Sequence, residues 1–99
     1  AVTYAVGSSP QSVALGDING DNRLDIVVGN YAGSSVSVLR GWGNTTFSLL
    51  ATLATGTNPY WVAVADLNND TRNDIIVSNY GTNTIGLFRG FGNGTFSAQ

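Results

Sequence analysis

The chain has 99 residues, of which 42% are hydrophobic and 10% are charged, and its formal net charge is −2. This length allows one small domain, and the apolar content is sufficient for a hydrophobic core. All six acids are Asp and all four bases are Arg, with no basic cluster, so nucleic acid and anionic membranes are poor partners. The absence of Cys and His excludes disulfides, zinc thiolate sites, thiol catalysis and the usual general base. No apolar run is long enough to span a bilayer.

Each half of the chain contains four strand-like runs rich in β-branched and apolar residues, separated by turns of Gly, Asn, Ser or Pro. In chain order the first four runs are Ser12–Gly16, Leu24–Asn30, Val36–Arg40 and Phe47–Thr55. The second four are Trp61–Ala65, Asn73–Asn79, Ile85–Arg89 and Phe96 onward. The first strand of each set carries small residues on one face, as in Ala14 and Gly16, which suits close packing near a central axis.

The two halves are an internal repeat, because residues 1–49 align with residues 50–98 without a gap. Pro10 aligns with Pro59 and Arg40 aligns with Arg89. A period of this size indicates a propeller, solenoid or array, and four antiparallel strands per repeat indicate a propeller blade. We therefore predict an all-β chain with two four-stranded blades, residues 1–49 and 50–99, in which residues 1–7 form half of a fourth strand.

The turn between the first two strands of each repeat contains all the acids of the chain. It reads Asp17-Ile18-Asn19-Gly20-Asp21-Asn22-Arg23-Leu24-Asp25 in the first repeat and Asp66-Leu67-Asn68-Asn69-Asp70-Thr71-Arg72-Asn73-Asp74 in the second. Oxygens at positions 1, 3, 5 and 9 can converge with the backbone carbonyl of position 7, and such a shell suits Ca²⁺ better than Mg²⁺. We predict two calcium ions per chain, with these ligands: Asp17, Asn19, Asp21, Asp25, Asp66, Asn68, Asp70 and Asp74 through side chains, and Arg23 and Arg72 through carbonyls.

Two other interpretations of these turns were weighed. An EF-hand is excluded, because Val28 and Val77 stand where that loop needs a bidentate Glu, and the flanking segments are strands. The other is a pair of Asn- and Asp-rich turns whose side chains only cap their own backbone. Three carboxylates crowded into one turn repel one another without a cation, and a second copy in register also favours calcium.

The acidic loops resemble those of FG-GAP/VCBS repeats, which are the blades of integrin-α-like β-propellers. The strand segments that follow the loops also fit this family, as does the segment after the third predicted strand of the second repeat: Ile26-Val27-Val28, Ile75-Ile76-Val77 and Gly92-Asn93-Gly94-Thr95-Phe96. The resemblance covers essentially the whole chain and implies an extracellular or cell-surface module for adhesion or scaffolding. The chain departs from the family at Asn22 and Thr71, where Gly is usual. Because β-branched Thr tolerates a left-handed backbone poorly, the second loop is expected to bind calcium more weakly or to adjust its turn.

Catalysis is not expected. Without His, Glu, Lys or Cys, only the loop Asp residues could activate a hydroxyl, and these are better explained as calcium ligands. Arg40 and Arg89 end the third strand of each repeat, on the same side as the acidic turns, where they can offset Asp charge or remain solvated.

Four aromatic residues fall at the opposite end of the predicted blades: Tyr31, Tyr60, Trp61 and Tyr80. Exposed aromatic rings beside Asn and Ser can stack on a sugar while the polar groups bond its hydroxyls. The resemblance also implies ligands at the blade loops, as in integrin-like propellers and similar lectins. The second function class is therefore a glycan-binding lectin stabilised by, or dependent on, calcium, and an extracellular protein ligand is also open.

Asn-x-Ser/Thr motifs occur at Asn44, Asn69 and Asn93. Asn44 and Asn93 are repeat equivalents in the turn after the third strand, where N-glycosylation can occur in a secretory host. Asn69 lies inside an acidic loop, and chance matches are common in such turns.

Two blades cannot close a ring, so each chain is expected to expose two apolar sheet faces. Residues 1–7 correspond to the strand half that the end of the chain lacks, which predicts that Val2–Val6 of one copy pairs beside Ile85–Phe88 of the next. Head-to-tail contacts of this kind can close into a homo-oligomer, a trimer of six blades or a tetramer of eight. A longer parent protein would instead close the ring within one chain.

Overall fold

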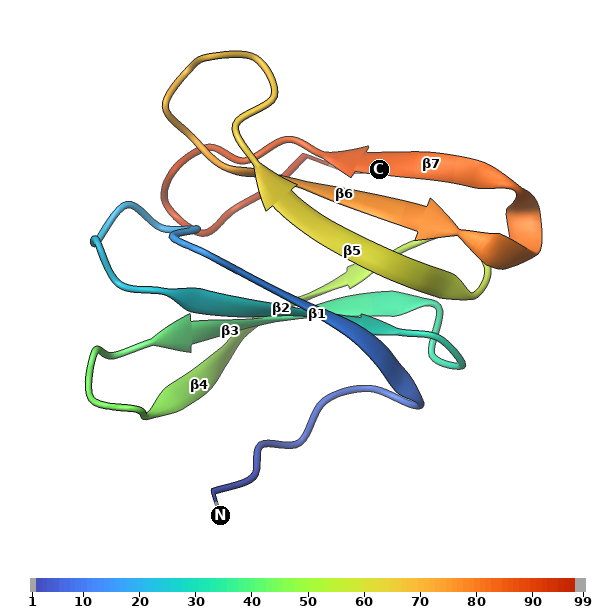
Figure 1. Ribbon diagram of the computed structural model, residues 1–99, viewed down its shortest axis with the longest axis horizontal. Helices are drawn as coiled ribbons and strands as arrows, with labels where there is room; N and C mark the ends of the chain where they lie inside the picture. Colours follow the sequence, from blue (N-terminus) through green and yellow to red (C-terminus); the bar gives the residue numbers. More distant parts are fainter. Residues whose placement is uncertain (1, 98–99) are drawn as a thin grey trace.

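The computed structural model describes residues 2–97, which form two antiparallel sheets and one turn of 3₁₀ helix (Figure 1). The first sheet is a meander of β1 (Pro10–Gly16), β2 (Asp25–Asn30), β3 (Ser35–Gly41) and β4 (Phe47–Ala54). The second contains β5 (Pro59–Ala65), β6 (Asp74–Asn79) and β7 (Thr84–Phe88), with the helix η1 (Tyr80–Thr82) between its last two strands. The all-β class is confirmed, and seven of the eight predicted strands form within a few residues of their predicted bounds.

The second sheet has three strands where we predicted four. The run expected from Phe96 onward forms a single bridge to Gly90, followed by a hydrogen bond from the Ser97 N–H to the Arg89 carbonyl at 2.9 Å. Residues 98–99 of this predicted strand lie outside the described part of the chain. A ladder needs several consecutive paired residues, so the outer edge of β7 carries no strand within residues 2–97.

Residues 2–6, predicted as half of a strand, are not in a strand in this chain. Tyr4 holds this segment against the turn before β4. Its hydroxyl donates to the Thr45 carbonyl at 3.2 Å and accepts from the Phe47 N–H at 3.1 Å, and its ring packs edge-on against Phe47. The segment is therefore attached to the first sheet by one side chain and not by a backbone ladder.

Strands β1 and β5 begin at Pro10 and Pro59, a position that proline tolerates because no ladder hydrogen bond is lost there. The register of each pair shifts directly afterwards, between Pro10 and Ser12 and between Pro59 and Trp61. Each shift is a bulge, whose extra residue is Gln11 in the first sheet and Tyr60 in the second, and bulges re-aim side chains at sheet ends.

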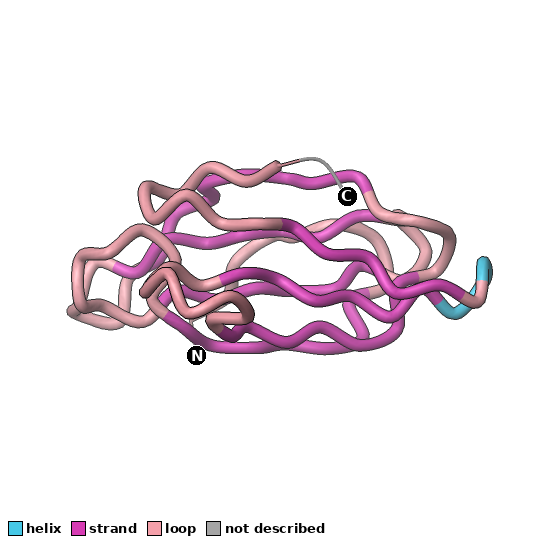
Figure 2. Tube along the Cα trace, turned by 90° about the horizontal axis from the view of Figure 1, so that it is seen from above, coloured by secondary structure: helices cyan, strands magenta, loops and turns pink. Residues whose placement is uncertain are grey.

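The two sheets pack against each other, with β5 contacting both β1 and β2. The buried core comes from both sheets and from the first acidic loop, and consists of Ile18, Val27, Val36, Val38, Val62, Ile75, Val77 and Phe88. A Cβ on Gly16 would lie 2.6 Å from Val64 Cγ1, so the small residue predicted near the axis admits the neighbouring sheet. Seen from above, strands occupy the middle of the molecule and loops gather at its two ends (Figure 2).

The outer faces of the sheets expose residues whose repeat equivalents are core. Val36 is 0% exposed, whereas its equivalent Ile85 is 72% exposed; Val62 is 2% exposed, whereas its equivalent Val13 is 63% exposed. The same repeat position is buried where the other sheet covers it and exposed where nothing does. Two apolar faces are thus left uncovered within the described chain, as expected for two blades.

Candidate functional site

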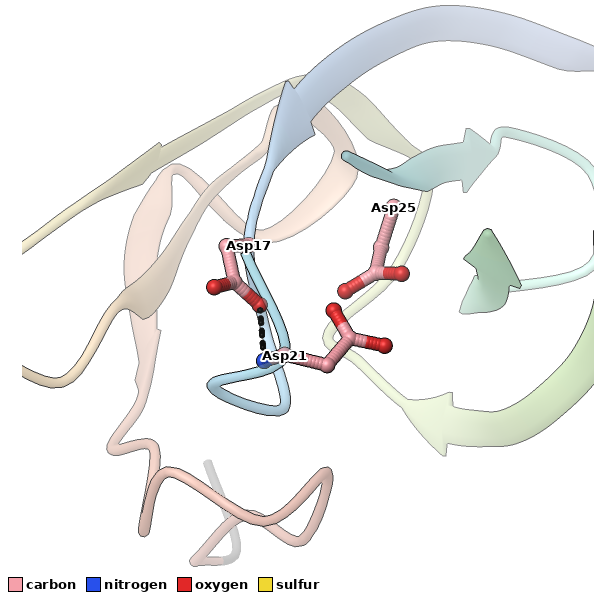
Figure 3. Close-up of side chains that lie close together, drawn as sticks. All are labelled: Asp17, Asp21 and Asp25. Carbon is pink, nitrogen blue, oxygen red and sulfur yellow. Dashed lines mark hydrogen bonds between the residues drawn. The ribbon is translucent and has the colours of Figure 1, made fainter. Parts of the chain in front are cut away.

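The first acidic loop joins the end of β1 to the start of β2, and its carboxylates face one another (Figure 3). One ligand oxygen from each of Asp17, Asp21 and Asp25 lies within 4.8 Å of the others. A single ion that takes oxygens at about 2.3–2.6 Å, as calcium does, can therefore reach all three. The structure brings together three of the ligands predicted for this loop.

Asp17 folds the loop around its own carboxylate. Its Oδ1 accepts from the backbone N–H groups of Gly20 at 2.8 Å and Asp21 at 3.2 Å, and its Oδ2 accepts from Asn22 at 2.8 Å. Asp21 Oδ1 accepts in turn from the Arg23 N–H at 3.0 Å. This is the backbone capping that we weighed as an alternative, but it does not exclude a metal, because two carboxylate oxygens offer about four lone-pair sites.

Asp25 connects the loop to the sheet. Its carboxylate is fully buried, with Oδ2 accepting from the Ile18 N–H at 2.8 Å and Oδ1 from the Gly41 N–H at 2.7 Å. Ile18 is itself 1% exposed, so the loop is anchored by one apolar and one polar contact. Gly41 is required here, since a Cβ would lie 2.1 Å from the Leu24 carbonyl oxygen. Asp74 repeats the arrangement, accepting from Leu67 and Gly90 at 3.2 and 2.7 Å.

The Asn19 side chain lies between the two half-buried carboxylates, those of Asp17 and Asp21. One of its two terminal amide atoms is 2.9 Å from Asp21 Oδ1 and 3.2 Å from Asp17 Oδ1. With nitrogen there, Asn19 donates to both carboxylates and its oxygen accepts from Arg40 Nε at 3.2 Å. With oxygen there, it adds a further ligand to the acidic cluster. The orientation of this amide therefore decides whether the loop presents a fourth side-chain oxygen beside its three carboxylates.

Arg40 offsets the charge of the first loop, as one of the two alternatives weighed above proposed. Its Nε is 3.9 Å from Asp21 Oδ2, and its guanidinium lies 4.1 Å from the centre of the Trp42 ring. Both partners of the ion pair are partly exposed, so the pair contributes on the order of 0–1 kcal/mol. Arg89, the equivalent residue, lies 6.0 Å from the centre of the Phe91 ring.

The second loop repeats three of the four backbone hydrogen bonds of the first loop, without a counterpart of the one from Gly20. Asp66 accepts from the Asp70 and Thr71 N–H groups at 3.2 and 2.9 Å. The Arg72 N–H donates to Asp70 at 2.9 Å and holds the pKa of that carboxyl below its usual 3.8. Asn68 again lies between the acids, with an amide atom 2.9 Å from Asp70 Oδ1 and 3.2 Å from Asp66 Oδ1. Within residues 2–97, however, three carboxylates gather closely in the first loop alone.

The loops differ at the position where we noted a missing Gly. Asn22 has φ 62° and Thr71 has φ 64°, so both adopt the left-handed backbone. The second turn thus keeps the same shape and places a β-branched residue in a conformation that L-residues avoid. Arg23 and Arg72 were predicted to bind the metal through their carbonyls. In the structure, their backbone N–H groups donate hydrogen bonds to Asp21 and Asp70. Ligation through their carbonyls remains a prediction.

Three of the four predicted aromatic residues meet at the other end of the sheets. The Tyr31 and Tyr60 rings lie 6.4 Å apart at 78°, and the Tyr60 and Tyr80 rings lie 6.1 Å apart at 45°. With Gln11 they line a cleft of about 420 Å³, which we call the tyrosine cleft. Trp61 does not line it and is 63% exposed. The sequence analysis missed Gln11, although its alignment with Tyr60 was a signal that could have revealed it.

The predicted glycosylation sites Asn44 and Asn93 lie in exposed turns after β3 and β7. Asn93 Oδ1 accepts from the Thr95 hydroxyl at 2.6 Å, and Asn44 Oδ1 accepts from the Thr46 hydroxyl in the same way. The geometry shows access and leaves modification itself a prediction.

A family model described as FG-GAP-like repeat matches residues 17–77, more than half of the chain. The match begins at the first acidic loop, includes the second and ends within β6. No curated protein and no solved structure matches the chain. Among the described residues, no helix is long and apolar enough to cross a membrane.

Proposed function

The chain belongs to the FG-GAP-like repeat family, and we propose that it is a calcium-binding β-propeller module that serves adhesion or scaffolding outside the cell and not catalysis. The observation that carries this proposal is the first acidic loop, where three carboxylates approach within 4.8 Å of one another. Such a cluster is repulsive on its own and becomes stabilising around a divalent cation.

The ligand set favours calcium. In the first loop Asp17, Asn19, Asp21 and Asp25 offer side-chain oxygens only, and hard oxygen shells suit calcium. The second loop repeats these residue types, so we propose two ions per chain. The first loop binds more tightly, because its carboxylates already converge and its left-handed residue is Asn and not Thr.

Chelation tests the proposal. An ion that binds only the folded state adds about 2.7 kcal/mol at a hundredfold excess over its Kd, which corresponds to roughly 10–20 °C in Tm for a domain of this size. We expect the Tm in calcium to fall by this order when EDTA is added. Asp21→Ala should remove more of the calcium-dependent shift than Asp70→Ala. A Tm that EDTA leaves unchanged would contradict calcium binding.

We further propose that the uncovered faces pack against blades of other copies, giving a closed ring of six or eight blades. Leu87 is 52% exposed, whereas its repeat equivalent Val38 is fully buried, so the position is built for a covering sheet. Val36 in β3 pairs with Leu53 in β4. This pairing predicts the register in which residues 2–6 of a neighbouring copy would pair with β7. By repeat equivalence, Ile85 would face Tyr4 of the neighbouring copy.

Glycan binding is a second candidate function, favoured by one observation, the tyrosine cleft. A protein ligand at the same end of the blades is the broader form of this proposal.

We also propose N-glycosylation of Asn44 and Asn93 in a secretory host, supported by their exposure. Intact mass after expression in a eukaryotic secretory host tests it, and an unshifted mass would reject it.

A further inference from the structure

We propose that the tyrosine cleft binds one neutral pyranose unit of a glycan, by stacking and hydrogen bonding, without calcium as a bridging ion. The proposal rests on the second function proposed above and narrows its ligand class. It does not depend on whether the acidic loops are occupied.

The shape of the tyrosine cleft fits a single sugar unit. Its volume of about 420 Å³ lies within the ~300–1,000 Å³ of typical small-molecule sites. The rings meet at 78° and 45°, so they form the walls of a corner and leave faces free for stacking. Tyr60 and Tyr80 remain 53% and 68% exposed although they pack against each other.

The polar groups of the tyrosine cleft are unused. Within residues 2–97, the hydroxyls of Tyr31, Tyr60 and Tyr80 and the amide of Gln11 have no hydrogen-bond partner within the protein, and all four residues line the cleft. The Tyr4 hydroxyl, in contrast, bonds both Thr45 and Phe47. Free hydroxyls at the edges of exposed rings match the chemistry of a pyranose, which has an apolar C–H face and a rim of hydroxyls.

The charge distribution of the protein favours a neutral ligand. Every acid lies in the two acidic loops, and the Arg residues lie in those loops or near the ends of β3 and β7, at Arg40 and Arg89. The segments at the end that carries the tyrosine cleft, residues 7–11, 30–35, 54–60 and 79–84, contain no charged residue. A sialylated or sulfated sugar, or a phosphopeptide, would find no partner for its charge.

The same separation excludes calcium bridging. β2 runs from Asp25 at the acidic loop to Asn30, the residue before Tyr31. Six residues at about 3.3 Å each separate the two ends by roughly 15–20 Å. A sugar held by Tyr31 cannot coordinate an ion held by Asp25.

The tyrosine cleft lies at the junction of the two sheets. Gln11 lies in β1 and Tyr31 directly follows β2, whereas Tyr60 lies in β5 and Tyr80 begins η1 directly after β6. In a ring of copies, the second sheet of one copy would meet the first sheet of the next copy. At that junction, Gln11 of the next copy would occupy the position that Tyr60 has in the tyrosine cleft. One site per chain is therefore expected. A proline-rich peptide fits less well, because its grooves use extended aromatic ridges, whereas these rings enclose a corner.

The test is an array of neutral and acidic oligosaccharides, probed with the full chain in calcium and then in EDTA at a temperature where it stays folded. We expect binding to neutral glycans alone, with a Kd that EDTA changes by less than twofold. Tyr60→Ala should weaken binding by more than tenfold, and Tyr60→Phe should weaken it less because the ring remains.

Trp61→Ala is the matched control, since Trp61 is the next residue, is also more than half exposed and lies outside the tyrosine cleft. It should leave the Kd unchanged. Tyr80→Ala is the second cleft variant if Tyr60→Ala lowers the Tm. Binding that survives both cleft variants, requires calcium in the folded protein, prefers acidic glycans or goes to a proline-rich peptide would overturn the proposal. An array without any binding would contradict both this proposal and the lectin function. The chelation test of calcium binding does not depend on either result.

Discussion

Thr71 is a β-branched residue at which local backbone preference conflicts with the turn that the repeat requires. It adopts φ 64°, as its equivalent Asn22 does with φ 62°. A left-handed conformation costs an L-residue roughly 1–2 kcal/mol, and Asn offsets part of this through local hydrogen bonds. The loop keeps this turn because Asp66 binds the backbone N–H groups of Asp70 and Thr71.

We therefore predict opposite effects for a reciprocal exchange. Thr71→Asn should raise the free energy of unfolding by about 1 kcal/mol, and Asn22→Thr should lower it by a similar amount. Urea denaturation in EDTA measures both and removes any contribution from calcium. Changes of the same sign in the two variants would show that backbone strain does not distinguish the loops.

At the level of elements, the acidic loops are joined to the sheets by buried carboxylates. Asp25 accepts from Ile18 in its own loop and from Gly41 at the end of β3, so it ties three segments together. The sequence does not predict this role, because Asp25 has the same residue type and loop spacing as the other predicted metal ligands, Asp17 and Asp21. Only burial separates them.

Asp25→Asn should destabilise the fold even without calcium. The amide can accept one of the two backbone N–H groups and must turn its own NH₂ toward the other. An unsatisfied buried donor costs about 1–3 kcal/mol. Asp21→Asn, in the same loop but partly exposed, is the control and should cost less than about 1 kcal/mol in EDTA. Equal losses in the two variants would argue against the tying role.

The elements that the sequence predicts well are those set by local chemistry. Runs such as Ile26-Val27-Val28 form strands, and Asn- and Asp-rich turns join them, because β-branched residues and turn residues act over a few positions. The bulges at Gln11 and Tyr60 were not predicted, since they arise from pairing between strands and a proline start. The tyrosine cleft was half predicted: the aromatic residues were identified, but which of them meet depends on how the bulges aim them. Within residues 2–97, the predicted eighth strand is represented by the Gly90–Phe96 bridge and one further hydrogen bond, from Ser97 to Arg89.

At the scale of the whole molecule, the repeat explains the surface. Ile85 is 72% exposed where its equivalent Val36 is fully buried, and Val13 is exposed where Val62 is buried. One sheet face on each side thus has core composition and no covering sheet in the described chain. At about 25 cal/mol per Å² of apolar surface, covering both faces provides a substantial driving force for assembly.

We predict that the chain forms closed assemblies of three or four copies, with a mass three or four times 10.3 kDa. Ile85→Asp should reduce the assembly to smaller species, because it places a charge in the contact. Thr82→Asp, an exposed change in η1 away from this face, should not. Light scattering distinguishes the cases, and a compact, folded wild-type monomer would refute the assembly.

The central claim is that both acidic loops bind calcium, and calcium stoichiometry by calorimetric titration tests it most directly. We expect two ions per chain in the wild type, with tighter binding at the first loop. Asp21→Ala and Asp70→Ala should each leave one ion, and the Asp21→Ala variant should retain the weaker site. A folded wild-type chain that takes up no calcium would contradict the claim.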